Sequence, residues 1–530
     1  MKNYRKKMVC LLVICLFIIG CGQRVQVEEP TTIDVDTTIG SLAEVFSFES
    51  IPVSGYSLVG GLRGTGSPQC PPSIRSYLEQ YILGKLPDTD IEKLISSNNT
   101  AVVSVNGFIP PLASKNERFD VKVAALAGTQ TISLDGGQLW GADLTEARMF
   151  GGTPKVSVTA EGPVFINKIS DGNLQRDKKV GYILAGGRVL DDYGLSVVLR
   201  RPDYKISSII RNLLNERFGK DTATAVSQSL VSLKVPAKYR NQKERFISIV
   251  RETYLLHSAE IKKQRIRESI GKLAVSEDKY KYEITLEAIG NECLDKLAAL
   301  LNSSDEQLRL HAGRCMLNLG SDAAVETLRQ IATDKASLYR LEALEAITKS
   351  APYNDATATS RRLLRDEDFA IRLAAYENLR ELDDISITAS LIGRNFYLEQ
   401  ITQTTYKAIF VSRSGVPRIA LFGAPMRCRD NVFIQSDNGE VTINAQRGEK
   451  EVSIIRKHPR RPSIPIRLKS SFEVGDIIRT MCESADVEQT SQVRPGLGVS
   501  YDDAISILKQ MCDKGAIEAE FRAGEMPKID

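Results

Sequence analysis

Aromatic residues and histidine are scarce in this chain. Only 6% of its 530 residues are Phe, Trp or Tyr, and Trp140 is the single tryptophan. Proteins that bind sugars or single-stranded nucleic acid stack their ligands on aromatic side chains, so neither class is favoured. The three histidines (His257, His311 and His458) do not stand at metal-ligand spacing, and no CxxC pair is present. We therefore expect no metal site and no cofactor.

Excess positive charge is also lacking once the N-terminus is set aside. The formal net charge is +4, but residues 2–7 carry four Lys and Arg side chains ahead of an apolar run over 8–20. This run is too short to span a bilayer as a helix, and its charged start is typical of an export signal. Removal of residues 1–20 leaves a nearly neutral chain. Nucleic acid is therefore not expected as a partner.

The cysteines are few and widely spaced. Ile18-Ile19-Gly20-Cys21 has the pattern of a bacterial lipoprotein cleavage site, and the alternative is an ordinary signal with a chance cysteine. Because Gly22 replaces the aspartate that often retains lipoproteins in the inner membrane, we expect an outer-membrane anchor on Cys21 that faces the periplasm. Each methylene of an acyl chain that is buried in the membrane contributes about 0.8 kcal/mol to the free energy of membrane binding. Cys482 and Cys512 are the candidate disulfide, because both lie in one short C-terminal segment.

No catalytic motif is complete. The stretch Gly55–Ser67 (GYSLVGGLRGTGS) has glycine spacing like a phosphate loop, but the lysine is absent and Pro68 follows Ser67. The nucleophile-elbow pattern fails as well, because Val59 stands where a glycine is needed. We expect these glycines to serve the backbone, through positive φ and close approach of strands. Asp120, Asp135 and Asp143 are expected as solvated turn residues, and the chain is not expected to be an enzyme.

The chain changes character twice along its length. Residues 51–199 alternate as β-strands do, and Pro202-Asp203 begins a helical pattern. Over 240–400 prolines nearly vanish, and the motifs Arg309-Leu310-His311-Ala312, Arg340-Leu341-Glu342-Ala343 and Arg372-Leu373-Ala374-Ala375 recur at intervals of 31 and 32 residues. This period predicts an α-solenoid of units similar to short HEAT repeats. The surface of such a solenoid usually contacts a protein. From Thr404 the pattern is β again, with a hairpin at Asn438-Gly439 and a helical end.

A basic run follows that hairpin. Its residues are Arg456, Lys457, Arg460, Arg461, Arg467 and Lys469. Two interpretations are open. The simpler interpretation is a solvated strand edge. The more specific interpretation is contact with an anionic partner or envelope polymer, for which the candidate residues are Arg456, Lys457, Arg460 and Arg461.

The glycine stretch belongs to a longer pattern. It is followed by PPLASKNERFDVKVAALAG, by LSVVLRRPDYKISSIIRNLLNERFG and, at the end, by GVSYDDAISILKQMCDKGAIEAEF. In this order the segments resemble the flagellar P-ring protein family over about residues 40–260 and 404–522. The resemblance implies structural roles for Gly55, Tyr56, Gly61, Gly64, Gly66, Pro110, Pro111, Asp120, Pro202 and Asp203.

This resemblance implies a structural subunit of a periplasmic bushing around the flagellar rod, which supports motility. Its expected partners are copies of itself in a ring, the rod and outer-membrane ring proteins, and peptidoglycan. The alternative is a lipid-anchored envelope scaffold that keeps the ring fold and docks an unknown protein on its HEAT-like repeats. Cys21 and the inserted solenoid depart from the family pattern.

The fold class expected is multidomain α+β, with β-rich ring domains at both ends of the mature chain and an inserted solenoid. We expect a signal peptide over 1–20, a lipidated tether over 21–48, a β-rich P-ring-like domain over 49–165, a second α/β P-ring-like domain over 166–260, a HEAT-like α-solenoid over 261–400, a β-rich segment over 401–472 and a small helical segment over 473–530.

Overall fold

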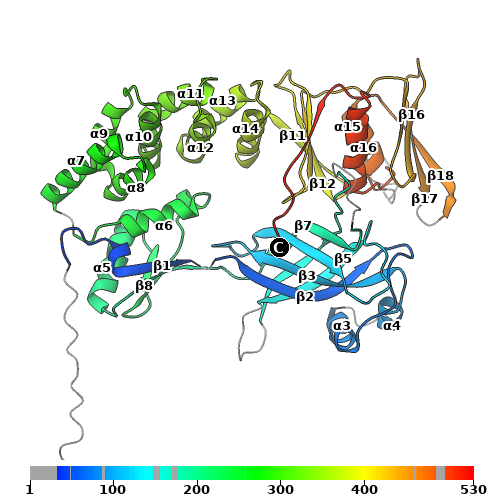
Figure 1. Cartoon of the computed structure of the whole chain (residues 1–530), viewed down its shortest axis with the longest axis horizontal. Helices are drawn as coiled ribbons and strands as arrows, with labels where there is room; N and C mark the ends of the chain where they lie inside the picture. Colours follow the sequence, from blue (N-terminus) through cyan, green and yellow to red (C-terminus); the bar gives the residue numbers. More distant parts are fainter. Residues whose placement is uncertain are drawn as a thin grey trace, which may run out of the picture.

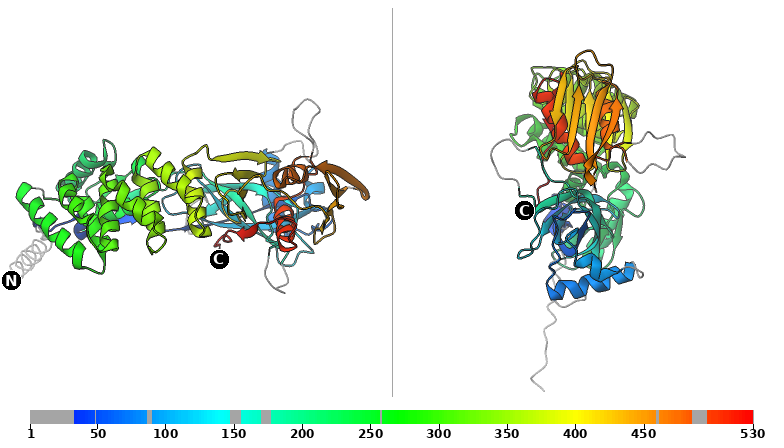
Figure 2. Two further views of the ribbon diagram at one scale, coloured as in Figure 1. Left: turned by 90° about the horizontal axis from the view of Figure 1, so that it is seen from above. Right: turned by 90° about the vertical axis from the view of Figure 1, so that its right-hand side faces the viewer.

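The protein is arranged in two layers (Figure 1). The computed structural model describes residues 33–47, 49–85, 90–146, 155–169, 177–256, 258–458, 461–484 and 496–529. A β-barrel and a small α/β unit form the lower layer, and a helical solenoid and a C-terminal α/β unit form the upper one. From above, the molecule is elongated (Figure 2). Among the described residues, no helix has both the length and the apolar character to cross a membrane.

The barrel consists of six antiparallel strands that close in the order β2-β3-β4-β7-β6-β5. Its interior is filled by inward-facing aliphatic side chains such as Val103, Val105, Val121 and Val123, all fully buried. A closed barrel leaves no unpaired strand edge. Its strands are β2 (Ile51–Gly60), β3 (Thr100–Ile109), β4 (Arg118–Ala125), β5 (Gln138–Glu146), β6 (Val156–Pro163) and β7 (Val180–Val189), and α3 (Pro72–Lys85) and α4 (Ile91–Ile95) pack outside it.

The glycine stretch of the sequence forms the end of β2 and the turn that follows. A Cβ atom on Gly66 would lie 2.0 Å from the carbonyl oxygen of Thr100, and one on Gly55 would lie 2.5 Å from that of Asp143. Gly64 has φ of +89°, which a side chain disfavours. The expectation that these glycines serve the backbone is therefore confirmed.

The small unit is a four-stranded sheet covered on one face by helices. The strand order is β1-β8-β10-β9. Asp203 caps α5, since its Oδ1 accepts from the amides of Lys205 (2.8 Å) and Ile206 (3.2 Å), as the sequence predicted. Its elements are α2 (Ile39–Leu42), β1 (Ala43–Ser47), β8 (Leu195–Leu199), α5 (Tyr204–Phe218), β9 (Ala223–Ala225), β10 (Leu230–Leu233), η1 (Ala237–Tyr239) and α6 (Lys243–Glu252).

The solenoid follows as paired antiparallel helices. One row of helices faces the lower layer and the other faces away from it (Figure 1). The inner row is α8 (Lys279–Ile289), α10 (Glu306–Asn318), α12 (Arg340–Ser350) and α14 (Phe369–Glu381). The remaining helices are α7 (Ala259–Val275), η2 (Asn291–Cys293), α9 (Leu294–Leu300), η3 (Asp322–Ala324), α11 (Val325–Thr333) and α13 (Tyr353–Leu363).

Two positions of the recurring Arg-Leu-x-Ala motif, the arginine and the last alanine, have separate structural roles. Its arginine turns back to the preceding loop: Arg309 Nη1 donates to the carbonyl of Ser303 (2.7 Å), and Arg372 Nη1 donates to that of Asp366 (2.7 Å). Its last residue is an alanine that is fully buried in all three copies (Ala312, Ala343 and Ala375). The motif therefore fixes a loop and lets neighbouring helices approach closely.

The C-terminal unit places two helices between two sheets (Figures 1 and 2). The sheets have the orders β11-β12-β14-β13-β19 and β15-β16-β17-β18. The predicted hairpin at Asn438-Gly439 joins β15 to β16, with Gly439 at φ +65°. The elements are β11 (Ile387–Ile392), β12 (Phe396–Ile401), β13 (Ala408–Val411), β14 (Arg418–Phe422), β15 (Val432–Gln435), β16 (Val441–Ala445), β17 (Val452–His458), β18 (Arg461–Ser470), α15 (Val474–Cys482), α16 (Tyr501–Asp513) and β19 (Glu520–Ala523).

Candidate functional site

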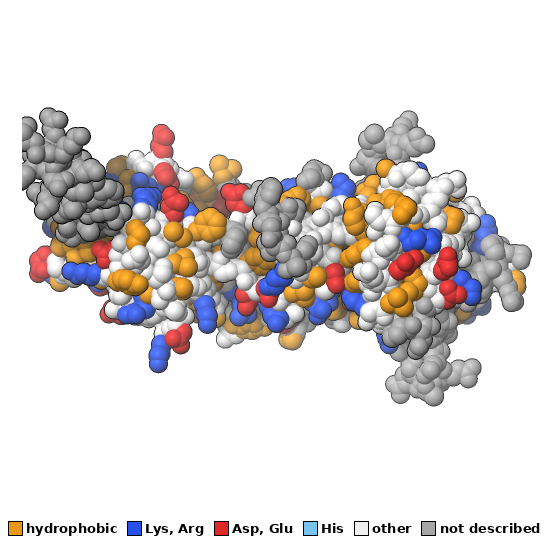
Figure 3. Space-filling view, turned by 90° about the horizontal axis from the view of Figure 1, so that it is seen from below, with side chains coloured by type: hydrophobic (Ala, Val, Ile, Leu, Met, Phe, Trp, Pro, Cys, Tyr) orange, Lys and Arg blue, Asp and Glu red, His pale blue; other side chains and the backbone are white. Residues whose placement is uncertain are grey.

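The described residues contain no cluster of three or more His, Cys, Asp and Glu side chains that could hold a metal ion. On the face seen from below, acidic and basic side chains are interspersed rather than gathered by sign (Figure 3). The chemistry of this part of the chain is concentrated instead in buried polar junctions between its units. These junctions are the candidate functional site, because they set the shape that the molecule presents to others.

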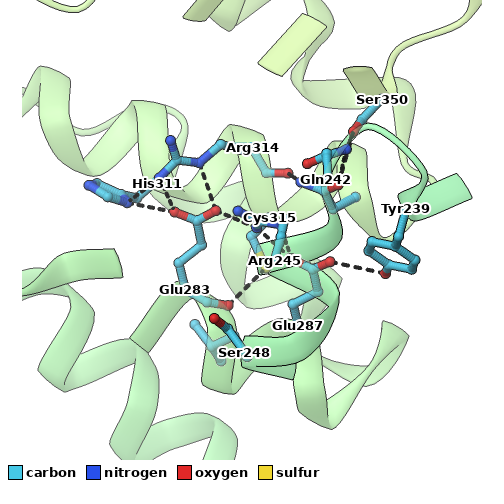
Figure 4. A network of polar contacts seen from close by, with 12 residues as sticks. Tyr239, Gln242, Arg245, Ser248, Glu283, Glu287, His311, Arg314, Cys315 and Ser350 are labelled. Carbon is cyan, nitrogen blue, oxygen red and sulfur yellow. Dashed lines mark hydrogen bonds and ion pairs between the residues drawn. The ribbon is translucent and has the colours of Figure 1, made fainter. Parts of the chain in front are cut away.

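The first junction joins α6 of the small unit to α8 and α10 of the solenoid (Figure 4). Glu283 and Glu287 lie on α8 and are both fully buried. Arg245 of α6 bonds both carboxylates, with its Nε 2.9 Å from Glu287 Oε2. On α10, Arg314 forks onto Glu283 at 2.8 and 2.6 Å, and His311 Nδ1 lies 2.6 Å from Glu283 Oε2. We refer to these five residues as the α8 network.

The two carboxyl groups of the α8 network are held in different electrostatic states. Burial raises the pKa of Glu283, but Arg245 and Arg314 outweigh it and hold this pKa well below the ordinary value. For Glu287 burial dominates over the attraction of Arg245, and its pKa is raised. Tyr239 donates its hydroxyl to Glu287 at 3.2 Å. Glu283 is thus the anionic centre of the junction.

The same junction extends along the inner row of the solenoid. The segment 237–245, which includes η1 and the start of α6, bonds the C-terminal ends of successive inner helices. Lys238 donates to the carbonyl of Asn318 on α10, and Gln242 Nε2 lies 3.2 Å from Ser350 Oγ on α12. A cation at a helix C-terminus is favoured by the helix dipole. The inner row therefore holds a segment of its own chain.

The second junction fixes the other end of the solenoid to the five-stranded sheet. Tyr376 and Arg380 of α14 both bond Glu399 of β12, and Arg380 Nε lies 2.9 Å from its Oε1. Glu399 is 2% exposed. Burial, assisted by Glu399, raises the pKa of Tyr376. The Tyr376 ring also meets that of Phe422 edge-on at 5.3 Å. The solenoid is therefore anchored at both ends.

The third junction ties the barrel to the C-terminal unit. Lys168 lies after β6 and contacts three carboxylates, Asp135 (2.8 Å), Asp502 (2.9 Å) and Asp503 (2.7 Å). Burial, partly offset by Lys168, raises the pKa of Asp502 to about 6. Asp120 also joins the two units, since it accepts from the backbone amides of Ala185 (2.6 Å) and Gly415. We refer to Lys168 and its three carboxylates as the Lys168 cluster.

Two of the expected solvated aspartates therefore have other roles. Asp120 and Asp135 were expected in solvent, but Asp120 bonds Gly415 of the C-terminal unit, and Asp135 pairs with Lys168, which itself contacts Asp502 and Asp503 of that unit. Asp143 lies 3.5 Å from Lys85 Nζ. Burial raises the pKa of Asp120, although the two amides oppose it. No local pattern predicts these pairings, because Lys168 lies 33 residues from Asp135, and Ala185 and Gly415 lie 65 and 295 residues from Asp120.

The basic run is only partly at the surface. Arg456 is buried, and its Nη1 donates to the carbonyl of Gly498 at 2.6 Å, so neither a solvated strand edge nor a surface contact with an anionic partner describes this residue. Lys457 is exposed. Arg460 and the side chain of Arg461 lie outside the described residues, as does Cys21.

The remaining candidates are cysteines and motif residues. Cys482 and Cys512 are free cysteines in the structure, in contrast to the expected disulfide. Tyr56 is 41% exposed on β2. The structure places the other motif residues as backbone features: Gly61 has φ of +81°, Pro110 and Pro111 follow β3, and Pro202 precedes the cap of α5.

Residues of the α8 network and Lys168 were missed as functional candidates from the sequence. Glu283 and Glu287 are four apart on a helix, which predicts a shared face but not burial. Their partners come from α6 and α10, and those of Lys168 from the turn before β5 and from α16. No spacing rule brings such residues together.

Comparison with known proteins matches two separate segments of the chain to two families. The model of the flagellar P-ring protein family matches residues 38–277, and that of HEAT repeats matches residues 294–380. The first match includes the barrel, the small unit and α7, and the second covers α9 to α13 and most of α14. The resemblance expected over 404–522 lies outside both matches and stays a prediction.

Individual relatives agree with the first match. The flagellar P-ring protein of Thermotoga maritima is 30% identical over 260 residues, which cover 47% of this chain and 72% of that protein. That of Anaeromyxobacter dehalogenans is 30% identical over 227 residues, covering 40% and 58%. Flagellar P-ring protein 1 of Hahella chejuensis is 31% identical over 216 residues, covering 37% and 54%. With its barrel and small unit matched in this way, the chain belongs to the flagellar P-ring protein family.

Proposed function

We propose that this protein is a structural subunit of the flagellar basal-body P ring, a periplasmic bushing around the rod, and that it supports motility by assembly and not by catalysis. The observation that carries this proposal is the continuous family match over residues 38–277. Its partners would be other copies of the chain, the rod and outer-membrane ring proteins, and peptidoglycan. The domain bounds that the sequence predicts are proposed together with this function.

The architecture is suited to ring building. A ring needs head-to-tail contacts that close on themselves. The barrel has no free strand edge, but each open sheet ends in two edge strands that could pair with another copy, namely β1 and β9, β11 and β19, and β15 and β18. Contacts between copies would then use the small unit and the C-terminal unit.

The solenoid supports a different role from the partner-docking arm of the alternative hypothesis. Its inner row bonds segment 237–245, and its two ends are held by the α8 network and by Glu399. We infer that it braces the small unit against the C-terminal unit. The lipidation of Cys21 is a separate proposal, which would hold the protein at the outer membrane.

Electron microscopy of the tagged full-length protein, extracted with detergent from its native envelope, tests the main proposal. Rings that co-purify with rod and hook are expected. Monomers or small oligomers bound to another envelope protein would favour the scaffold instead. Mass spectrometry of the N-terminal peptide tests lipidation, with Cys21→Ser as the control that cannot carry the lipid.

A further inference from the structure

Two buried thiols lie against the same turn of α8. Cys293 ends η2, just before α9, and Cys315 lies on α10; both are fully buried and, like the other described cysteines, free in the structure. Cys293 Sγ is 3.5 Å from the carbonyl oxygen of Leu286, and Cys315 Sγ is 3.7 Å from that of Glu283. Carbonyls three residues apart lie on one face of a helix, one above the other. Cys293 also acts on the Cys315 thiol as a hydrogen-bonding neighbour, so the two sulfur atoms lie close together.

We propose that Cys293 and Cys315 form a disulfide in the mature protein. The bond would connect the start of α9 to the second half of α10, and so close the helical hairpin that these helices form. The inference rests on the periplasmic location of the P ring, an oxidising compartment in which disulfides persist, and not on ring assembly. It also concerns the repeat segment, outside the residues matched to the P-ring family.

The other described cysteines lack such a neighbour. Burial raises the pKa of Cys70, Cys428, Cys482 and Cys512, and no second cysteine acts on any of these thiols. The pKa of Cys315 is raised chiefly by burial and further by Cys293. The pair is thus distinguished from the other thiols by geometry and by mutual interaction.

Formation of the bond removes two electrons and two protons from the thiols. A thiolate of one cysteine attacks the disulfide of an envelope thiol oxidase, and the second cysteine then displaces the oxidase, which leaves as a dithiol. In the folded protein Cys315 is held as a thiol by its raised pKa and is shielded from solvent, so it reacts slowly. Oxidation therefore belongs to the period after export and before α8 covers the pair.

Alkylation mapping of the full-length protein from its native envelope tests the proposal. The protein is denatured in the presence of an alkylating reagent, digested and analysed by mass spectrometry with and without prior reduction. We expect Cys293 and Cys315 to resist alkylation until a reductant is added. Their peptides should be joined and lighter than the sum of the two by two hydrogen atoms.

Two variants give the matched comparison. In Cys293→Ala, Cys315 should be alkylated without reductant, whereas in Cys428→Ala, which removes another buried cysteine, the pair should stay protected. Full alkylation of both thiols in the unreduced wild-type protein, or a bond to any other cysteine, would overturn the proposal. Electron microscopy of the same sample tests ring assembly independently. Rings in which Cys293 and Cys315 are reduced would therefore refute the disulfide and leave the proposed function standing.

Discussion

Arg245 is the residue on which the α8 network depends most. It is the cation shared by Glu283 and Glu287, which are fully buried on α8. In Arg245→Met, Glu287 loses its ion-pair partner and Glu283 keeps only Arg314 and His311. Removal of one partner of a buried pair costs about 3–5 kcal/mol, so we expect a loss of this order in the free energy of unfolding of the solenoid.

An exposed ion pair of the same solenoid provides the control. Lys262 on α7 pairs with Glu292 at 2.7 Å, and 28% and 52% of the two side chains are exposed. Lys262→Met should therefore change the free energy of unfolding by about 1 kcal/mol or less. Urea unfolding followed by circular dichroism measures both variants. Equal effects would show that the α8 network is not a stabilising junction.

Asp502 makes the Lys168 cluster sensitive to pH. Its pKa is raised from 3.8 to about 6, because burial outweighs the attraction of Lys168. The folded state binds this proton more tightly than the unfolded state does. The contribution of Asp502 to stability is therefore fully present below about pH 4 and is lost as the pH rises through about 6.

The variant Asp502→Asn keeps this side chain uncharged at every pH, while Asp135 and Asp503 still pair with Lys168. We expect its thermal midpoint to rise relative to that of the wild type between about pH 4 and about pH 7. Thermal unfolding of both proteins across this range provides the measurement. A difference that does not depend on pH would contradict the assignment.

At the scale of elements, the repeat motif separates a packing position from a surface position. Ala343 on α12 is fully buried, whereas Leu341 on the same helix is 45% exposed. Ala343→Leu forces extra methylenes between helices and should cost about 1–3 kcal/mol. Leu341→Ala should stay within about 0.5 kcal/mol. The comparison uses the thermal midpoint of each variant, and a greater loss in Leu341→Ala would reverse our account of the motif.

Local patterns predicted the elements better than their assembly. Alternation predicted β-rich segments, the recurring arginine and alanine predicted the solenoid, and Asp203 predicted the start of α5. The closure of six strands into a barrel and the burial of α15 and α16 between two sheets were not predicted, because both depend on contacts between distant segments. Arg456 shows the same limit: a basic run predicts a surface, but this arginine folds inward to the carbonyl of Gly498.

At the scale of the whole molecule, the units form a closed frame. The small unit meets the solenoid at the α8 network, the solenoid meets the C-terminal unit at Glu399, and the C-terminal unit meets the barrel at the Lys168 cluster. The frame closes where Lys243 Nζ of α6 lies 2.8 Å from the carbonyl oxygen of Leu112 and 3.3 Å from Glu117, which follow β3. A closed frame keeps its shape when one corner is weakened, because the other corners still constrain it.

This closure predicts a non-additive effect on shape. Arg245→Met or Lys168→Met alone should lower stability but leave the radius of gyration unchanged, whereas the double variant should expand the molecule because two corners are released together. Small-angle X-ray scattering of the monomer measures the radius, and circular dichroism confirms that the elements persist. If either single variant expanded the molecule as much as the double variant, the corners would be acting in series, and the solenoid would be an arm and not a brace.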